Sequence, residues 1–444
     1  MRDVEGLLME KQNNPDGCGM STQLVPTGLR LCSAFLLLAM ALLSASCGGS
    51  SAAAPAQPPQ GLPALTSPGP SNSYLGTQSP GDMWQASIDH TSNSFSVADL
   101  TDASAGTVLG SVVEQIGFLG LAQTNISPPF QPFGFALEIP SRVLLLRPGM
   151  NTAGLVALVP GSCLNINGSV TFQFVTLPDA TWNAGTDAAY GSVQVSVNGT
   201  TWNLSGYTQF TLGNSSDPGK TGTTGTCSTS TAGGLVTIPP NPPSNVSATI
   251  GVGPSGFFAA DHFLSTASGT VASAAGVIQP SSSVNVGSVV SGSYLGFIYE
   301  PNVTAGSATC VSDCLAPTQM AAFSGSVTDC LTPPSASGMC GGAFFNDILG
   351  NVKQASTDMT VEFGVEDPNN FGLFKSAQIT IPNPAGSAGA CTTPAVSGTD
   401  SQGNPTCTLP AIAVVGNPEN KFAIFVIAQD SVNNSPISIS LLQQ

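Results

Sequence analysis

From about residue 80 to the C-terminus, short runs rich in Val, Ile, Phe and Thr alternate with polar residues and end at Gly, Pro, Asn or Ser. A period of two places successive side chains on opposite faces of a strand, and such runs between turn residues are typical of antiparallel sheets. The chain also contains 50 Gly and 35 Pro, which disfavour long helices. The sequence therefore predicts an all-β fold, built as antiparallel meander barrels or sandwiches, with at most one short helix.

The clearest predicted hairpin joins residues 192–197 to residues 200–206 through Asn198-Gly199. Asn-Gly is a preferred pair for a two-residue type I′ turn. The facing pairs in that register are Val197 with Thr200, Val195 with Trp202, and Val193 with Leu204. The opposite face then carries Gln, Ser, Thr and Asn, so we expect a strand pair with one buried side.

The last predicted hairpin joins residues 421–429 to residues 435–442. Its first arm is apolar on both faces, which is typical of a central strand that is covered on both sides. In the second arm Ile437, Ile439 and Leu441 alternate with Ser, so we expect the Ser face to meet water. A C-terminal strand of this kind should tie the end of the chain into a sheet.

Helix signals are weak elsewhere, and residues 342–353 are the one segment in which we expect a short helix, because apolar residues recur there at i+4 spacing. The proline-rich stretch 238–245 is the best boundary between an N-terminal β half, residues 80–245, and a C-terminal β half, residues 246–444. A single continuous β domain is the alternative, because barrels and sandwiches can exceed 200 residues.

The N-terminal region carries an apolar run over residues 31–43, preceded by Arg30. This run is shorter than the roughly 20 residues of a membrane span but suits the core of a signal peptide. Ser44-Ala45-Ser46 and then Cys47 follow it. The pattern resembles the lipobox of bacterial prolipoproteins, in which the Cys is diacylated and becomes the new N-terminus. The resemblance implies a signal peptide over residues 1–46 and a lipid on Cys47.

The first 19 residues are acidic for a signal peptide, whereas Met20 opens a more typical one, so we expect translation to start at Met20. Residues 47–79 are rich in Gly, Ser, Ala and Pro, and this composition predicts a disordered tether. Gly48 rather than Asp follows Cys47. By resemblance to enteric lipoproteins, this implies the outer membrane or the cell surface.

Eleven cysteines are present, of which Cys18 and Cys32 leave with the signal peptide and Cys47 takes the lipid. The remaining even number in an exported chain predicts disulfides. These eight candidates are Cys163, Cys227, Cys310, Cys314, Cys330, Cys340, Cys391 and Cys407. The local pairs are Cys391–Cys407 and Cys163–Cys227, and the other four could nest or pair in sequence. A zinc site is disfavoured because the chain has only two His and lacks the usual Cys spacing.

The two histidines, His90 and His262, each follow an aspartate. Adjacent residues on a strand point to opposite faces, so neither aspartate is placed to orient its own His in a catalytic triad. No G-x-S-x-G motif occurs. We therefore predict no catalytic residue, no metal site and no cofactor.

Acidic residues offer two weaker possibilities. A glycosidase pair could be drawn from Glu300, Glu362, Glu366 and Asp367, but exposed carboxylates are expected on a chain with a net charge of -16. The loops 367–370 and 430–434 carry oxygen ligands but do not match a calcium-binding frame. Turn formation accounts for their Asp and Asn residues without a metal.

Charged residues make up only 8% of the chain, against roughly 25% in an ordinary soluble domain. The nine basic residues exclude a protein that binds nucleic acid by neutralising phosphates. We expect a lipid-anchored extracytoplasmic β-protein of the cell envelope with a non-catalytic binding, adhesion or structural role. Its partners would be the membrane, through the lipid, and either a small apolar ligand or a surface partner. A secreted, glycosidase-like hydrolase is the alternative.

Overall fold

A computed structural model of the chain describes residues 73–444, with gaps at residues 79–80, 116, 128, 130, 149–154, 161–162, 164–165, 167, 178–187, 213–222, 231–232, 239–247, 254, 266–270, 300–314, 322–336, 347–351, 356–358, 383–390, 392–394, 401 and 431–434. All of the described residues belong to one compact unit, Ala56–Gln444. Cys47, residues 48–72 of the expected tether, and Cys310, Cys314 and Cys330 lie outside the described residues. The expected tether is too long at its C-terminal end, because residues 73–78 form the first strand and bond to two neighbouring strands.

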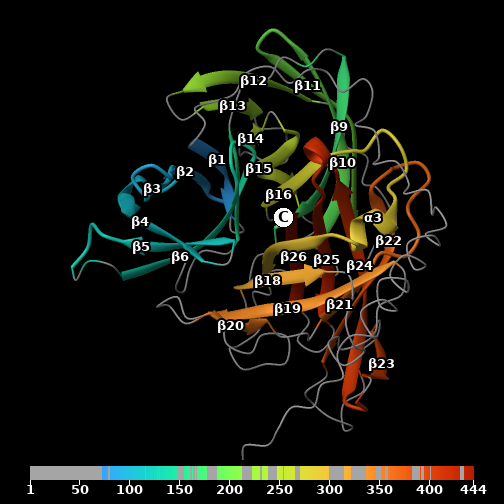
Figure 1. Cartoon of the computed structure of the whole chain (residues 1–444). Helices are drawn as coiled ribbons and strands as arrows, with labels where there is room; N and C mark the ends of the chain where they lie inside the picture. The colour runs from blue at the N-terminus through green and yellow to red at the C-terminus, as the bar shows by residue number, and fades with distance from the viewer. Residues whose placement is uncertain are drawn as a thin grey trace, which may run out of the picture. The chain divides into compact units, whose positions relative to one another are not determined.

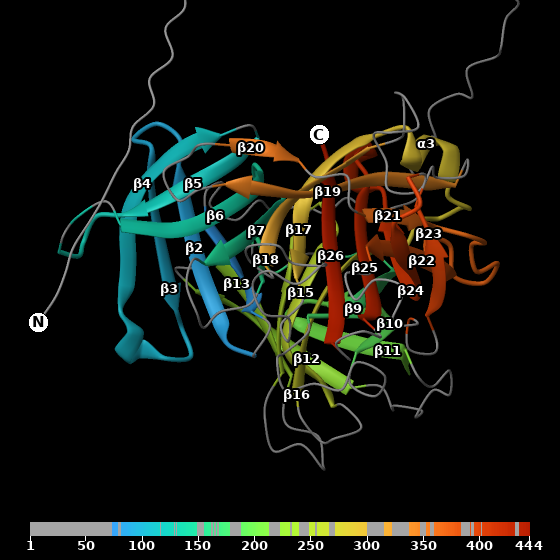
Figure 2. The same ribbon diagram turned by 90° about the horizontal axis from the view of Figure 1, so that it is seen from below.

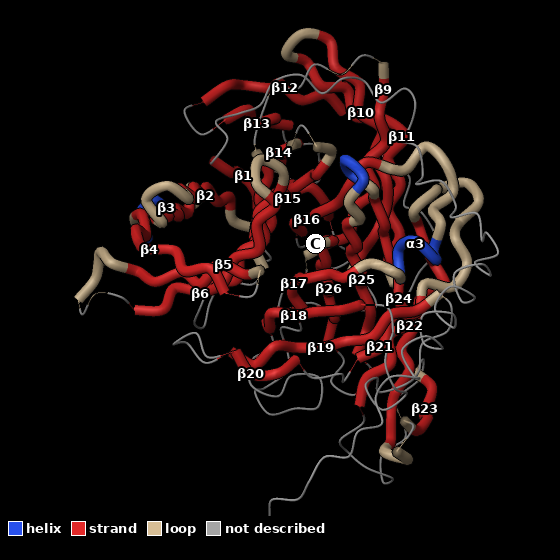
Figure 3. The backbone as a smooth tube through the Cα atoms, in the orientation of Figure 1, coloured by secondary structure: helices blue, strands red, loops and turns tan. Residues whose placement is uncertain are grey.

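The first sheet is a closed barrel, in which eight antiparallel strands pair in chain order and the last strand pairs with the first (Figures 1 and 3). The strands are β1 (Ser73–Gln78), β2 (Met83–Asp89), β3 (Ser94–Asp99), β4 (Thr107–Gln115), β5 (Phe118–Gln123), β6 (Gln131–Ile139), β7 (Val143–Pro148) and β8 (Val156–Val159). A short 3-10 helix, Ala103–Ala105, lies between β3 and β4.

The second sheet is also a closed barrel of eight antiparallel strands, and it is completed by pairing between β9 and β16 (Figure 1). The strands are β9 (Ser169–Thr176), β10 (Ala189–Asn198), β11 (Thr201–Thr211), β12 (Thr223–Ser230), β13 (Gly233–Ile238), β14 (Ala248–Val252), β15 (Phe257–Ser265) and β16 (Val271–Ile278).

The third sheet has ten strands (Figure 2). They are β17 (Ser293–Tyr299), β18 (Leu315–Ala321), β19 (Gly338–Asn346), β20 (Val352–Ala355), β21 (Met359–Glu362), β22 (Leu373–Pro382), β23 (Val396–Thr399), β24 (Pro405–Gly416), β25 (Ala423–Asp430) and β26 (Ser435–Gln443). Because β18 pairs with both β17 and β19, and β19 also pairs with β21, eight of these strands form a ring of bonded neighbours. β20 and β23 lie outside this ring.

The helix α3 (Val286–Val290) precedes β17, and a 3-10 helix, Pro418–Asn420, precedes β25. Among the described residues, no helix is long and apolar enough to cross a membrane. The all-β prediction, with at most one short helix, is therefore confirmed.

Each of the three sheets encloses an apolar cluster to which strands around the whole wall contribute. The large side chains in these interiors include Tyr74 and Phe95 in the first barrel, Phe172 and Trp202 in the second, and Phe363 and Phe374 in the third sheet, each at most 3% exposed. Burial of alternate residues on closed walls is the packing expected of small filled barrels. Of the two predicted architectures, the barrel is therefore the one that forms.

A fourth apolar cluster, the shared seam, lies where the outer faces of the three sheets meet. It includes Leu145 and Ala157 from the first barrel, Val175, Phe257 and Val277 from the second, and Phe297, Val414 and Phe425 from the third sheet. The seam explains why β25 is buried on both faces, as its sequence predicts.

The expectation that the Ser face of β26 meets water is wrong. Ser438 and Ser440 are both 0% exposed, because this face belongs to the side of the sheet that packs at the shared seam. Ser440 lies in register between Phe297 of β17 and Phe425 of β25. We infer that its small side chain leaves room for the two rings.

The hairpin at Gly199 forms with the predicted faces but with a shifted register. Asn198 pairs with Thr201, and Val197 pairs with Trp202 rather than with Thr200. The loop residues are thus Gly199 and Thr200, and Gly199 has a φ of 61°. Glycine at the first loop position fits a type II′ turn, which twists the strands in the same sense as the expected type I′ turn.

The described parts of residues 342–353, where a short helix was expected, are strands: residues 342–346 belong to β19 and residues 352–353 to β20. β19 extends to Asn346, and Phe344 pairs with Ala355 across to β20. β19 also has β18 and β21 as partners on its two sides. The hydrogen bonds to these neighbouring strands stabilise the strand more than the apolar i+4 spacing stabilises a helix. The glycines of the segment also have low helix propensity.

The proline-rich stretch 238–245 connects two neighbouring strands of the second barrel. Val236 of β13 pairs with Ile250 of β14 across it. The stretch therefore does not separate two sheets, and the described sheets instead succeed one another between β8 and β9 and between β16 and β17.

Both local disulfides predicted from the sequence are present. Cys163–Cys227 links the segment before β9 to β12 over a sequence separation of 64 residues, and Cys391–Cys407 links the segment before β23 to β24 over 16 residues. Cys340 of β19 is also disulfide-bonded. Such bonds stabilise a fold mainly by restricting the unfolded chain.

Candidate binding surface

His90 contacts a carboxylate that is distant in sequence. Its Nε2 atom lies 2.5 Å from Oε2 of Glu138, whereas Asp89 accepts hydrogen bonds from the backbone N–H groups of Thr91 and Ser92. The prediction that Asp89 is a poor partner for His90 is therefore confirmed, and Glu138 takes that place.

Glu138 is held on both of its oxygens. The Tyr74 hydroxyl donates to Oε1 at 2.5 Å, and the Glu138 side chain is only 4% exposed. Burial of Tyr74, together with the neighbouring Glu138 carboxylate, raises the pKa of the Tyr74 hydroxyl well above its usual range. The hydroxyl thus stays protonated and acts as a hydrogen-bond donor. The described contacts place no serine hydroxyl at His90, so this cluster lacks the nucleophile of a catalytic triad.

The second histidine, His262, lies on β15, and its side chain is outside the described residues. Asp261 beside it is 4% exposed, and its Oδ1 accepts from the Ser273 hydroxyl at 3.4 Å. Thr77 of the first barrel donates to Ser273 at 2.7 Å. This polar chain joins the first barrel to the second.

The candidate glycosidase carboxylates hold separate pieces of structure. Glu366 accepts from the backbone N–H groups of Val284 at 3.0 Å and Gly372 at 2.6 Å, and also from the Ser283 hydroxyl. Glu362 accepts from the Ser337 hydroxyl at 3.3 Å. Glu300 lies outside the described residues.

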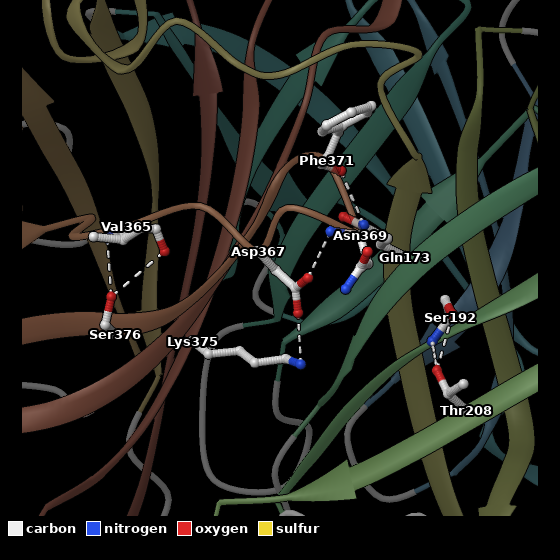
Figure 4. A network of polar contacts seen from close by, with 9 residues as sticks. All are labelled: Gln173, Ser192, Thr208, Val365, Asp367, Asn369, Phe371, Lys375 and Ser376. Carbon is white, nitrogen blue, oxygen red and sulfur yellow. Dashed lines mark hydrogen bonds and ion pairs between the residues drawn. The ribbon is translucent and has the colours of Figure 1, made fainter.

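Asp367 forms an ion pair with Lys375 at 2.6 Å and accepts from the backbone N–H of Asn369 at 2.9 Å (Figure 4). Burial raises the pKa of Asp367, but the hydrogen bonds from Lys375 and Asn369 outweigh it, so that the pKa lies below its usual range. Where the structure describes the chain, no group of three or more His, Cys, Asp or Glu residues is placed to hold a metal ion.

The outer wall of the second barrel carries rows of hydroxyl and amide side chains across β9–β14. We call this set the hydroxyl–amide face. Its first row is Asn198, Thr201, Thr226, Thr237 and Thr249; its second row is Ser169, Ser196, Asn203 and Thr224; its third row is Thr171, Gln194 and Ser205. None of the twelve is buried. Neighbouring strands lie about 4.8 Å apart, so the first row extends over about 19 Å.

The period of two explains why these side chains share one face. The residues between them point inward and form the core of the second barrel, for example Val195, Trp202 and Cys227. Threonine suits the outward positions because its branched side chain favours strands, and facing threonines on neighbouring strands stabilise each other. Two hydrogen bonds further order the face, from Gln194 Nε2 to Ser169 Oγ at 3.2 Å and from Ser205 Oγ to Gln194 Oε1 at 3.3 Å.

The face ends where the same wall enters the shared seam. Along β9, Ser169 is exposed, Thr171 is partly exposed, and Gln173 is 1% exposed and donates to the backbone oxygen of Phe371 at 2.9 Å (Figure 4). The Ser192 and Thr208 hydroxyls, 2.8 Å apart, lie on the same margin. Beyond them Lys375 Nζ lies 5.4 Å from the centre of the Phe210 ring.

The strands β9–β14 contain no charged residue. This distinguishes them from the strands of the first barrel, which include Asp89, Glu114 and Arg147, and from those of the third sheet, which include Glu362 and Lys375. The alternation in residues 192–206 predicts the polar side of one hairpin but not its continuation over β12–β14. The alternation of Thr224, Thr226 and Ser228 with Gly225 and Cys227 was the available signal.

No family model and no curated protein matches the sequence. Similar solved structures include two mutants of transferrin binding protein B from Haemophilus parasuis Hp5, described as a vaccine antigen. The double mutant is 8% identical over 82% of this chain and 65% of that chain, and the single mutant is 10% identical over 87% and 76%. This chain thus covers just under two thirds of the double mutant's length. Both TM-scores are 0.21, a value at which the likeness assigns no fold and no function.

Proposed function

We propose that the chain is a lipid-anchored protein of the cell envelope, on the outer membrane or cell surface, with a non-catalytic binding or adhesion role. The lipid would be attached at Cys47, and residues 48–72 would form a tether between the membrane and the first barrel, which begins with β1 at Ser73. The resemblance of residues 20–47 to a lipoprotein signal supports the anchor. The disulfides Cys163–Cys227 and Cys391–Cys407 support export to an oxidising compartment.

The single observation that carries the binding role is the hydroxyl–amide face. It is a wall of twelve polar side chains, none of them buried, and no charge interrupts the six strands that carry it. The side chains of the described barrel interiors pack against one another, which disfavours a small apolar ligand inside a barrel. Recognition is therefore assigned to the outer surface.

The glycosidase-like alternative needs two carboxylates that flank one sugar ring. Glu366 is instead engaged by the backbone of two loops, and Asp367 is engaged by Lys375. We therefore favour binding over hydrolysis.

The anchor and the role are tested together by displaying the chain on bacteria that otherwise lack it. Cells that carry the wild-type chain should fractionate it with membranes and should gain adhesion to other cells or to surfaces. Cells that carry Cys47→Ala should release the chain, and their adhesion should fall to that of cells without it. Membrane association that is unchanged in Cys47→Ala would refute the lipid anchor, and equal adhesion by cells with and without the displayed chain would refute the binding role.

A further inference from the structure

We propose that the hydroxyl–amide face binds an uncharged polysaccharide. This inference rests on the proposed binding role and names the class of ligand for that face.

The charge distribution excludes ionic ligands. The strands β9–β14 offer no carboxylate to a polycation and no basic group to a polyanion. Asp261 of β15 pairs with Thr249 at the end of the first row, but it is 4% exposed and accepts from the Ser273 hydroxyl. The chain as a whole carries a net charge of -16, which repels a polyanion. A basic group beyond the margin of the face, Lys375, is already paired with Asp367. The ligand that matches this surface is therefore neutral.

The side chains present also disfavour a protein partner. The energetic centres of protein interfaces are rich in Trp, Tyr and Arg, in pockets that exclude water. The twelve residues of the face are Ser, Thr, Asn and Gln, and the one tryptophan of these strands, Trp202, is 1% exposed and points into the barrel. The face thus has no apolar anchor for a protein surface.

Hydroxyl and amide groups match sugar hydroxyls because each can both donate and accept hydrogen bonds. Threonine has a stiff side chain on a strand, so these hydroxyls lose little conformational freedom on binding. Individually such bonds are weak against water. The repetition of the rows over about 19 Å lets a polymer form many of them at once, which raises the overall affinity.

Gln173 marks the inner limit of the face. Gln173 lies on the same side of β9 as Thr171 and is 1% exposed, and its Oε1 atom has no hydrogen-bond donor among the described residues. Its Nε2 atom is engaged by Phe371. Because the Oε1 atom is buried, it lies beyond the part of the face that a ligand can contact.

The inference is tested with the full chain carrying Cys47→Ala, purified in solution. Native electrophoresis through gels that contain dextran, a neutral β-glucan or a galactomannan is compared with gels that contain dextran sulfate or DEAE-dextran. A glycan array with neutral and anionic members extends the comparison. At least one neutral polysaccharide should retard the chain, and the charged derivatives of dextran should bind at least tenfold more weakly than that ligand.

Variants locate the site. Thr226→Asp and Thr237→Asp place a charge in the middle of the first row and should each weaken binding at least tenfold. Thr226→Ser keeps the hydroxyl and should stay within threefold of the wild type. Thr107→Asp, on the exposed outer side of β4, adds the same charge to another barrel and should leave binding unchanged. Circular dichroism and the unfolding midpoint confirm that the variants fold.

The polysaccharide proposal is overturned if no neutral glycan binds the chain. It is also overturned if Thr226→Asp binds the neutral glycan as tightly as the wild type does, or if dextran sulfate binds as tightly as the neutral glycan. Cells that display the chain can adhere, and Thr226→Asp can abolish that adhesion, while no neutral glycan binds the chain or competes with adhesion. In that case the binding role stands and the polysaccharide assignment fails. If displayed cells do not adhere at all, the proposed function fails as well.

Discussion

His90 and Glu138 are 48 positions apart in the sequence, yet the Nε2 atom of His90 lies 2.5 Å from the Oε2 atom of Glu138. The pair links the turn after β2 to the end of β6, and the buried Tyr74 hydroxyl donates to the other oxygen of the same carboxylate. Glu138 thus joins three strands at one place in the first barrel. These contacts stabilise the first barrel, and the raised pKa of the Tyr74 hydroxyl makes their contribution depend on alkaline pH.

Tyr74→Phe should lower the free energy of unfolding by about 2 kcal/mol at pH 7, because it leaves a buried carboxylate oxygen without its donor. The pKa of Tyr74 is raised in the folded state, so the stability that Tyr74 contributes is present below about pH 10 and is lost as pH rises beyond that value. The difference between wild type and variant in guanidinium unfolding should therefore narrow between pH 9 and pH 11.

His90, the exposed partner of Glu138, provides the control variant. His90→Gln keeps a donor beside Glu138, and the His90 side chain is 51% exposed, so its replacement should cost less than about 1 kcal/mol. A Tyr74→Phe difference that stays constant up to pH 11 would contradict the assigned role of Tyr74.

The two disulfides should differ in their contribution to stability. Loop-closure entropy predicts a loss of about 4 kcal/mol for the double variant Cys163→Ala/Cys227→Ala and about 3 kcal/mol for Cys391→Ala/Cys407→Ala, because the first bond closes the longer loop. Guanidinium unfolding without reductant measures both values. Equal losses, or a larger loss for the shorter loop, would show that native-state strain or residual structure outweighs the entropy.

Ser440→Ala should stabilise the chain by about 1 kcal/mol. The Ser440 hydroxyl is fully buried and has no hydrogen-bond partner among the described residues, so its removal relieves a desolvation cost without a large change in volume. Ser440→Val is the matched comparison, and it should destabilise by about 1–3 kcal/mol because it crowds Phe297 and Phe425. Thermal unfolding distinguishes the two, and a destabilised alanine variant would be the contrary result.

The ion pair between Asp367 and Lys375 should support stability only above acid pH. The pKa of Asp367 is lowered in the folded state, so its contribution is present above the usual carboxyl value near 4 and is lost as pH falls through the folded value. Asp367→Asn should flatten the acid limb of the stability curve. Lys375→Met keeps the stem over Phe210 and should cost less than about 1 kcal/mol at pH 7, because Lys375 is 44% exposed. Identical acid limbs in both variants and the wild type would contradict this role.

The local pattern of the sequence predicted the all-β fold and, for the β10–β11 hairpin, which side of each strand is buried. The alternation around Val195 and Trp202 predicted which side is buried, and the short spacing of Cys391 and Cys407 predicted their bond. Barrel closure was not predictable in this way, because the pairings of β1 with β8, β9 with β16, and β18 with β19 join segments that local periodicity does not relate.

The errors have the same physical origin. Ser440 has the pattern of a solvent-facing residue, and only the shared seam, to which all three sheets contribute, makes its position buried. Phe344 has helical spacing, and only its strand neighbours make it part of β19. The hydroxyl–amide face was predicted where β10 and β11 form a hairpin, but its extension to Thr237 and Thr249 depends on the pairing of β12, β13 and β14.

Adhesion of cells that display single-charge variants shows whether binding occurs at the hydroxyl–amide face. Thr226→Asp on the face, Thr107→Asp on β4, and Glu138→Gln inside the first barrel are displayed at equal levels and compared with the wild type. We expect cells with Thr226→Asp to lose at least nine tenths of the adhesion, whereas cells with either of the other two variants should retain it. Full adhesion by Thr226→Asp, or an equal loss in Thr107→Asp, would contradict binding at this face.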